Sequence, residues 1–206
     1  MTEFDPAELT KERNLLDIYR QSRKITSSGF NQVASAIVLC LLLTYVLASS
    51  NVHVIARNVR ELADLGFNFT VGILGFLLAG FTIFATVSKT KLLKTMAVTQ
   101  HKESGLSYLK YSFFAFMKVF IVYLAFATLC LLIKIIGGPE GPVTLLITWM
   151  PSGVRTLKRV VASISLIVVG TWFFFLLMVL KSFIFNVYHI VMTAIRWEFE
   201  NGQDNS

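Results

Sequence analysis

Four long apolar runs alternate with charged segments along this chain. The clearest run extends from Phe67 to Val87 without a charged residue, and the others cover about 31–50, 113–136 and 160–180. An α-helix needs about 20 apolar residues to cross the ~30 Å hydrocarbon core of a bilayer. The pattern therefore predicts an all-α membrane protein whose central domain, residues 31–180, contains four transmembrane helices.

Amphipathic segments are expected on both sides of this domain. In the N-terminal segment, residues 1–30, Asp5 is suited to cap a helix and Pro6 to occupy its first position, which predicts a helix from Asp5 to Ser28. Such a helix either lies on lipid headgroups or docks a partner. Beyond Lys181, apolar residues continue at helical spacing to Trp197, so the last helix is expected to project beyond the membrane into the 181–206 segment, which ends in a polar tail.

Small residues form a stripe within the Phe67–Val87 run. They recur every three or four positions, which places them on one face of a helix; they are Gly72, Gly75, Ala79, Thr82 and Thr86. Small residues let membrane helices approach closely, so this stripe is predicted to be a helix-packing seam, either within the chain or between two copies.

The segments between the runs carry unequal positive charge. Residues 51–64 are predicted to form a short amphipathic link, 88–112 a lysine-rich inner loop and 137–159 an outer loop. The N-terminal segment, the inner loop and the C-terminal segment together hold twelve basic residues, against five in the other two loops. Because basic residues stay on the cytoplasmic side, both termini are expected to be cytoplasmic.

Composition and motifs argue against an enzyme. The chain is 55% hydrophobic and 15% charged, and its net charge of +7 comes from basic residues that flank apolar runs, so the lipid bilayer is the expected partner and direct nucleic-acid binding is not expected. Cys40 and Cys130 lie inside apolar runs as core residues. The sequence has no phosphate-binding loop, HExxH or paired-cysteine motif, and the predicted spans contain no Asp or Glu. We therefore expect no catalytic residue, no cofactor and no metal site.

Two function classes remain. The first is a membrane anchor or sensor that holds a cytoplasmic effector. The residues expected to dock the effector are Phe183, Val187, Val191, Leu15 and Ile18. The second is a small oligomeric ion channel, in which Lys118 would supply a charge at the pore or at an interface.

The segment GILGFLLAGFTIFATVSK, followed by the lysine-rich loop, resembles small four-span membrane proteins of bacterial antiphage defence operons, above all the membrane subunit of the Kiwa system. In that family the membrane protein assembles as an oligomer and holds a cytoplasmic DNA-binding effector. The resemblance implies a homo-oligomer in the bacterial inner membrane that senses phage infection, but it assigns no functional residue.

Overall fold

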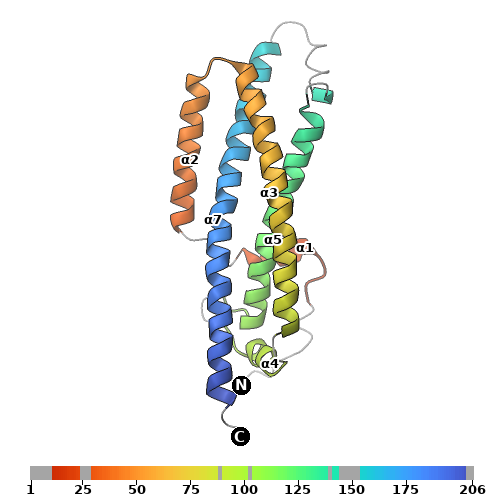
Figure 1. Ribbon diagram of the computed structural model, residues 1–206, viewed down its shortest axis with the longest axis vertical. Coiled ribbons are helices and arrows are strands. Elements are labelled where there is room, and N and C mark those ends of the chain that lie inside the picture. The colour runs from red at the N-terminus through yellow and green to blue at the C-terminus, as the bar shows by residue number, and fades with distance from the viewer. Residues whose placement is uncertain are drawn as a thin grey trace. The chain divides into compact units, whose positions relative to one another are not determined.

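The computed structural model of the chain describes residues 11–23, 29–87, 90–101, 104–138, 141–143 and 154–202. The labelled elements are all helices, and the described residues add one isolated β-bridge between Gln100 and Ser107. In chain order the helices (Figure 1) are α1 (Leu15–Ser22), α2 (Gly29–Ala48), α3 (Val52–Val87), α4 (Thr90–Val98), α5 (Tyr108–Ile136) and α7 (Val154–Gly202).

Four of these helices are long and apolar enough to cross a membrane. The qualifying stretches are Gly29–Ala48, Val52–Thr82, Tyr108–Ile136 and Thr156–Thr193. At 1.5 Å per residue, the 20 residues of α2 extend about 30 Å, and the 49 residues of α7 about 74 Å. The predicted all-α, four-span architecture is confirmed, and α7 is one continuous helix well beyond the expected end of its span.

The N-terminal helix is shorter than predicted. Residues 11–14 are not helical, and α1 starts at Leu15, where the Asn14 side chain accepts a hydrogen bond of 2.8 Å from the Asp17 amide. This is a conventional N-cap, because the Asn oxygen satisfies an amide that has no partner within the helix. The expected start at Asp5 and the end at Ser28 lie outside the described residues.

Residues 52–64 are not a separate link, because they form the first part of α3. The Asn51 side chain caps this helix by accepting from the amides of His53 (3.0 Å) and Val54 (3.4 Å). One face of α3 is then buried without interruption from the predicted link into the predicted span. Its buried residues recur every three or four positions and are Ile55, Val59, Ala63, Gly66 and Thr70.

A tight turn separates α4 from α5. Gly105 adopts a φ of +67°, which favours glycine, and its amide donates to the carbonyl of His101 at 3.1 Å. The His101 ring stacks on Tyr111 with the centroids 4.2 Å apart, so this histidine is half-buried within the turn.

The chain divides into two compact units, and the division falls within α3, α5 and α7. One unit, called here the α2 unit, comprises Ser27–Gly75 and Val122–Met178; the other, the α1 unit, comprises Met1–Thr26, Phe76–Ile121 and Val179–Ser206. The core of the α2 unit contains a cluster of Val46, Ile55, Val59, Ala162 and Leu166. In the α1 unit, Phe116 packs edge-on against Phe183, with ring centroids 4.8 Å apart.

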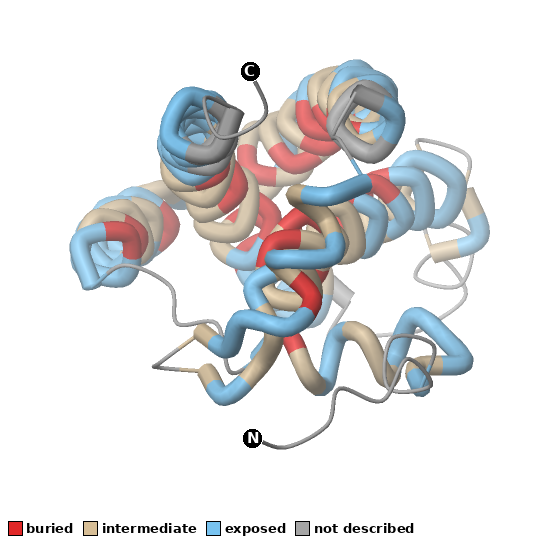
Figure 2. Tube along the Cα trace, turned by 90° about the horizontal axis from the view of Figure 1, so that it is seen from below, coloured by how far each residue is buried: buried red, intermediate tan, exposed pale blue. Residues whose placement is uncertain are grey.

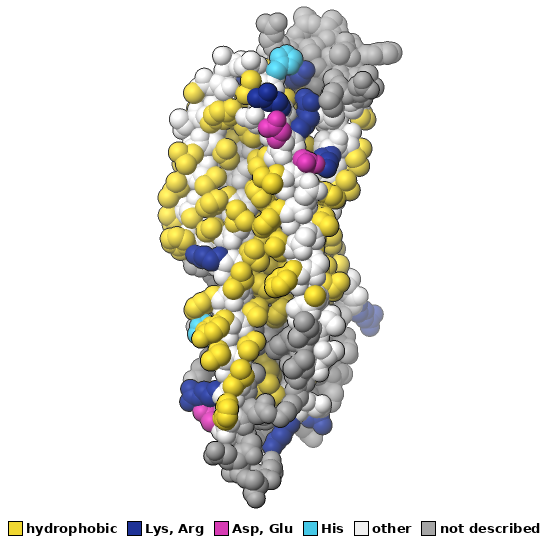
Figure 3. Space-filling model, viewed as in Figure 1, with side chains coloured by type: hydrophobic (Ala, Val, Ile, Leu, Met, Phe, Trp, Pro, Cys, Tyr) yellow, Lys and Arg dark blue, Asp and Glu magenta, His cyan; other side chains and the backbone are white. Residues whose placement is uncertain are grey.

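Every long helix also has an exposed face, drawn pale blue in Figure 2. Many of the exposed side chains are large and apolar, and the face in Figure 3 is covered mainly by hydrophobic side chains. Leu41 and Leu47 on α2, for example, are 65% and 80% exposed. An apolar exterior on bilayer-length helices is expected where lipid, rather than water, is the solvent.

Two glycines of the α2 unit lie directly against side chains of a neighbouring helix. A Cβ atom at Gly66 would lie 2.9 Å from Cε1 of Phe126 and 3.3 Å from Sγ of Cys130. A Cβ atom at Gly170 would lie 2.7 Å from Cδ1 of Leu42. The absence of a side chain at these positions lets α3 approach α5, and α7 approach α2.

Polar contacts supplement this packing. The buried Tyr123 hydroxyl on α5 donates to the Leu176 carbonyl on α7 at 2.8 Å, and the amide group of Asn31 on α2 donates to the Met178 carbonyl at 3.2 Å. At the other end of α2, Arg159 donates to the Ser49 carbonyl at 3.0 Å. Hydrogen bonds near both ends of α2 therefore hold it alongside residues 159–178 of α7.

Candidate functional surfaces

The predicted seam lies on an exposed face of α3. Gly72, Gly75, Ala79, Thr82 and Thr86 are all exposed. A Cβ atom added to Gly72 or Gly75 would meet no atom within 4 Å. The described part of this chain therefore does not use the stripe for its own packing, which occurs instead at Gly66 and Gly170.

Polar residues extend the same stripe toward the start of α3. Asp64 and Asn68 are exposed and lie at helical spacing from Gly72, and the Asn68 amide group donates to the Asp64 carboxylate at 3.5 Å. Asp64 also forms an ion pair with Lys134 of α5, and the Lys134 ammonium lies 5.2 Å from the centre of the Phe67 ring. The stretch of α3 that is long and apolar enough to cross a membrane, Val52–Thr82, thus includes Glu61 and Asp64, whereas the predicted span began at Phe67 and contains no Asp or Glu.

The expected docking residues on α7 do not share one exposed surface. Phe183 is only 7% exposed because it packs on Phe116, so it is unavailable to a partner. Val187 is half-buried, and Val191 is exposed. The spacing of the apolar residues correctly predicted that α7 continues as a helix. The spacing did not distinguish the face of α7 that packs on α5 from the face that remains exposed.

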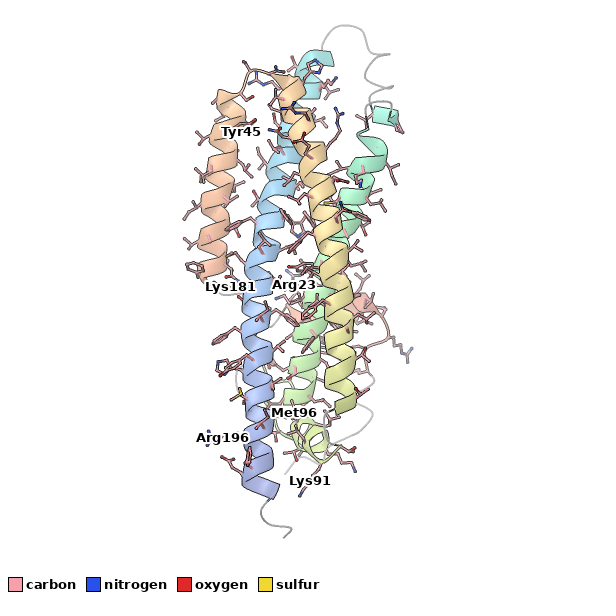
Figure 4. All side chains as sticks on the ribbon, viewed as in Figure 1. Arg23, Tyr45, Lys91, Met96, Lys181 and Arg196 are labelled. Atoms are coloured by element: carbon pink, nitrogen blue, oxygen red, sulfur yellow. The ribbon has the colours of Figure 1, made fainter. Side chains whose placement is uncertain are left out.

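The open face of α7, called here the α7 stripe, carries larger apolar residues. Its members recur every three or four positions along the helix and are Ile184, Tyr188, Val191, Ile195 and Phe199, each between 44% and 73% exposed. Two basic residues of α7 lie near this stripe and are labelled in Figure 4. Lys181 precedes the stripe, and Arg196 directly follows Ile195 in the sequence. Arg196 pairs with Glu200 at 2.7 Å, and this hydrogen bond raises the pKa of the Arg196 guanidinium above its ordinary value.

The expected docking residues on α1 belong to the same compact unit as the α7 stripe. Leu15 is 47% exposed and Ile18 is half-buried. Before α1, Glu12 forms an ion pair of 2.9 Å with Lys110 at the start of α5, and both side chains are at most 15% exposed. This pair fixes Glu12 against the start of α5, and Leu15 remains accessible.

Lys118 is half-buried on α5. It lies between two well-buried residues of the α1 unit, Phe116 and Val119. A role for Lys118 at a pore or an interface stays a prediction.

A cavity of about 240 Å³ opens between α3, α5 and α7 in the α2 unit. Its wall is mostly apolar, but it includes the basic residues Arg60 and Lys158. The sequence did not identify Arg60 or Lys158 as site residues, because Arg60 lies in the predicted link and Lys158 in the predicted outer loop. Only the continuation of α3 through residue 60 brings them to one cavity.

Metal-binding geometry is not found in the part of the chain that the structure describes, where no group of three or more His, Cys, Asp or Glu side chains could hold an ion. The two cysteines are free. Cys130 is buried, as expected of a core residue, but the same expectation was wrong for Cys40, which is exposed on α2.

These features define a multi-pass α-helical membrane protein with exposed apolar and small-residue helix faces. Comparison with protein families, curated proteins and solved structures gives no match to this chain. Its function must therefore be inferred from its own surfaces.

Proposed function

We propose that the chain is a non-enzymatic, oligomeric anchor or sensor of the bacterial inner membrane that holds a cytoplasmic effector, with a role in antiphage defence. The observation that carries the proposal is the α7 stripe. A bilayer core is ~30 Å thick, whereas α7 is about 74 Å long, so a large part of α7 lies outside the hydrocarbon.

An apolar helix face outside the hydrocarbon needs a cover. Exposed contiguous apolar surface on a protein marks a site of association, and a helix presents such a site through residues three and four positions apart. The α7 stripe has this spacing, and Leu15 of α1 belongs to the same unit. A soluble effector with a complementary apolar surface would cover both. The defence role rests on the sequence resemblance.

Self-association is assigned to the exposed stripe of α3. Lipid chains pack poorly against a face of Gly, Ala and Thr, while a second copy can approach it closely. The hydroxyls of Thr82 and Thr86 donate to carbonyls of their own helix at 2.9 Å, so they can enter such an interface without leaving a polar group unsatisfied.

The proposal is tested by affinity purification of the tagged full chain from its native cells in a mild detergent, with the mass of the particle measured at the same time. We expect a stoichiometric soluble protein that is lost from the Tyr188→Asp and Val191→Asp variants. The matched control variants, Tyr188→Phe and Val191→Leu, keep the surface apolar and should still co-purify with the soluble protein.

The self-association step has a separate readout. Gly75→Ile should reduce the particle to a smaller mass, whereas Gly80→Ile, on the same helix but off the stripe, should not. If the purified particle is a homo-oligomer that lacks a stoichiometric partner and conducts ions in planar bilayers, the anchor hypothesis is contradicted and the channel alternative is established.

A further inference from the structure

The cavity in the α2 unit combines an apolar wall with two cationic side chains. Val59 of α3, Leu132 and Ile136 of α5, and Val161 and Ala162 of α7 supply apolar wall, and Arg60 and Lys158 are its charged residues. Both charged residues are half-buried. The volume, about 240 Å³, is just below the ~300 Å³ of the smallest usual ligand pockets, which suits part of one acyl chain and not a whole lipid.

The acidic residues nearby are already engaged. Glu61 pairs with Arg57 at 3.6 Å, and Asp64 pairs with Lys134. Among the described residues, no acidic side chain pairs with Arg60 or Lys158. Partly buried cations without a counter-ion are costly, so an anion placed between them would be stabilised.

The cavity also has a defined direction along the bundle. Lys158 neighbours Arg159, which bonds the Ser49 carbonyl just after the end of α2. Val161, Ala162 and Ser165, which also line the cavity, follow Lys158 along α7 into the apolar span. Along α7 a ligand would therefore meet Lys158 first and the apolar Val161 and Ala162 deeper inside, as headgroup and chain are ordered in a membrane lipid. Along α3, Ala56 and Val59 precede Arg60, so the second cation lies deeper in the cavity.

We propose that this cavity binds an anionic phospholipid. The phosphate contacts the guanidinium of Arg60 and the ammonium of Lys158, and part of one acyl chain occupies the apolar part beside Val161 and Ala162. Basic pockets between transmembrane helices select anionic headgroups in this way, because the two cations match a net negative charge better than a zwitterion. This site is independent of the α7 stripe, so its test can fail without affecting the proposed effector docking.

Native mass spectrometry of the full chain in a neutral detergent tests the site, with dioleoyl phosphatidylglycerol and dioleoyl phosphatidylcholine as probes. We expect saturable binding of the phosphatidylglycerol at one site per chain and weaker binding of the phosphatidylcholine. Arg60→Gln and Lys158→Gln should each weaken the phosphatidylglycerol affinity about fivefold, and the double variant about 25-fold. Arg57→Gln is the matched control, because Arg57 is exposed and lies on the same helix outside the cavity.

Two further arms separate a lipid from a simple anion. Ala56→Leu narrows the apolar part without changing charge and should also weaken phosphatidylglycerol binding, while inorganic phosphate should not compete at equal concentration. Equal affinity for both lipids, or an equal loss in Arg57→Gln, would overturn the proposal. Full competition by inorganic phosphate together with no effect of Ala56→Leu would reduce the site to an anion site.

Discussion

Gly66 provides the sharpest test of how α3 packs on α5. A Cβ atom at this position would lie 2.9 Å and 3.2 Å from two ring carbons of Phe126 and 3.3 Å from Sγ of Cys130. Carbon atoms in favourable contact are about 3.5–4.0 Å apart, so the nearest ring atom would have to move by roughly 0.6 Å or more.

The neighbours of Gly66 have little room to move. Phe126 and Cys130 are fully buried. The Phe126 ring stacks on the Phe173 ring with the centroids 5.9 Å apart, and its centroid lies 5.7 Å from that of the Trp172 ring. Overfilling a well-packed site costs about 1–3 kcal/mol, and Val brings two more methyl groups than the Cβ considered above. We expect Gly66→Val to lower the free energy of unfolding by about 3 kcal/mol, and Gly66→Ala by less, because Ala regains about 1 kcal/mol of helix propensity.

The matched control is Gly80→Val on the same helix. A Cβ atom at Gly80 meets nothing within 4 Å, and Gly80 lies off the exposed stripe, so this variant introduces the same β-branched residue without the clash. Unfolding is followed by the reaction of the buried Cys130 thiol with a maleimide dye in a Cys40→Ser background, because Cys40 is exposed and would react in the folded state.

A double-mutant cycle identifies the clash itself. Phe126→Leu shortens the side chain that the new methyl groups meet, so it should recover part of the loss in Gly66→Val, with a coupling of about 0.5–3 kcal/mol. If Gly66→Val unfolds like Gly80→Val, or if Phe126→Leu simply adds its own cost, the close approach of α3 and α5 is refuted.

Three other substitutions test the polar contacts by the same thiol assay or by limited proteolysis. Tyr123→Phe removes the hydroxyl that bonds the Leu176 carbonyl and should cost about 0.6 kcal/mol, the average for a hydrogen bond between membrane helices; a cost indistinguishable from zero would show that the bond contributes nothing. Lys134→Met removes the cation that pairs with Asp64 and leaves the carboxylate with the long hydrogen bond from Asn68. It should therefore destabilise more than the double change Lys134→Met, Asp64→Leu, whereas a double variant as unstable as the single one would contradict the role of the pair. Glu12→Gln breaks the pair with Lys110 and should expose the segment before α1 to trypsin, and an unchanged cleavage rate would show that the pair does not hold it.

The sequence was sufficient for the class of fold because lipid imposes a simple rule. Each span must be a helix that satisfies its own backbone groups, so an uncharged run of about 20 apolar residues such as Phe67–Val87 identifies one. The same periodic argument correctly extended the last helix beyond Lys181, because the apolar spacing does not change there and no Pro or Gly interrupts it before Gly202.

The limits of the helices were less predictable. Charged residues between positions 57 and 64 suggested a link outside the span, yet α3 begins at Val52. The pairing of Glu61 with Arg57 and of Asp64 with Lys134 offsets the cost of these charges, and the second partner is distant in the sequence. Hydropathy along one segment does not contain that information.

The chain by itself determined that its helices cross a membrane and which residues share a helix face. Only the tertiary structure decided which face packs inside: on α3 the contacts are made at Gly66 while Gly72 and Gly75 remain exposed, and on α7 Phe183 is buried while Tyr188 is open. The physical reason is that both faces of a membrane helix are apolar, because lipid and protein interiors are alike in polarity. The choice between them depends on the shape of the neighbouring helix, such as the Phe126 ring, which packs where Gly66 has no side chain.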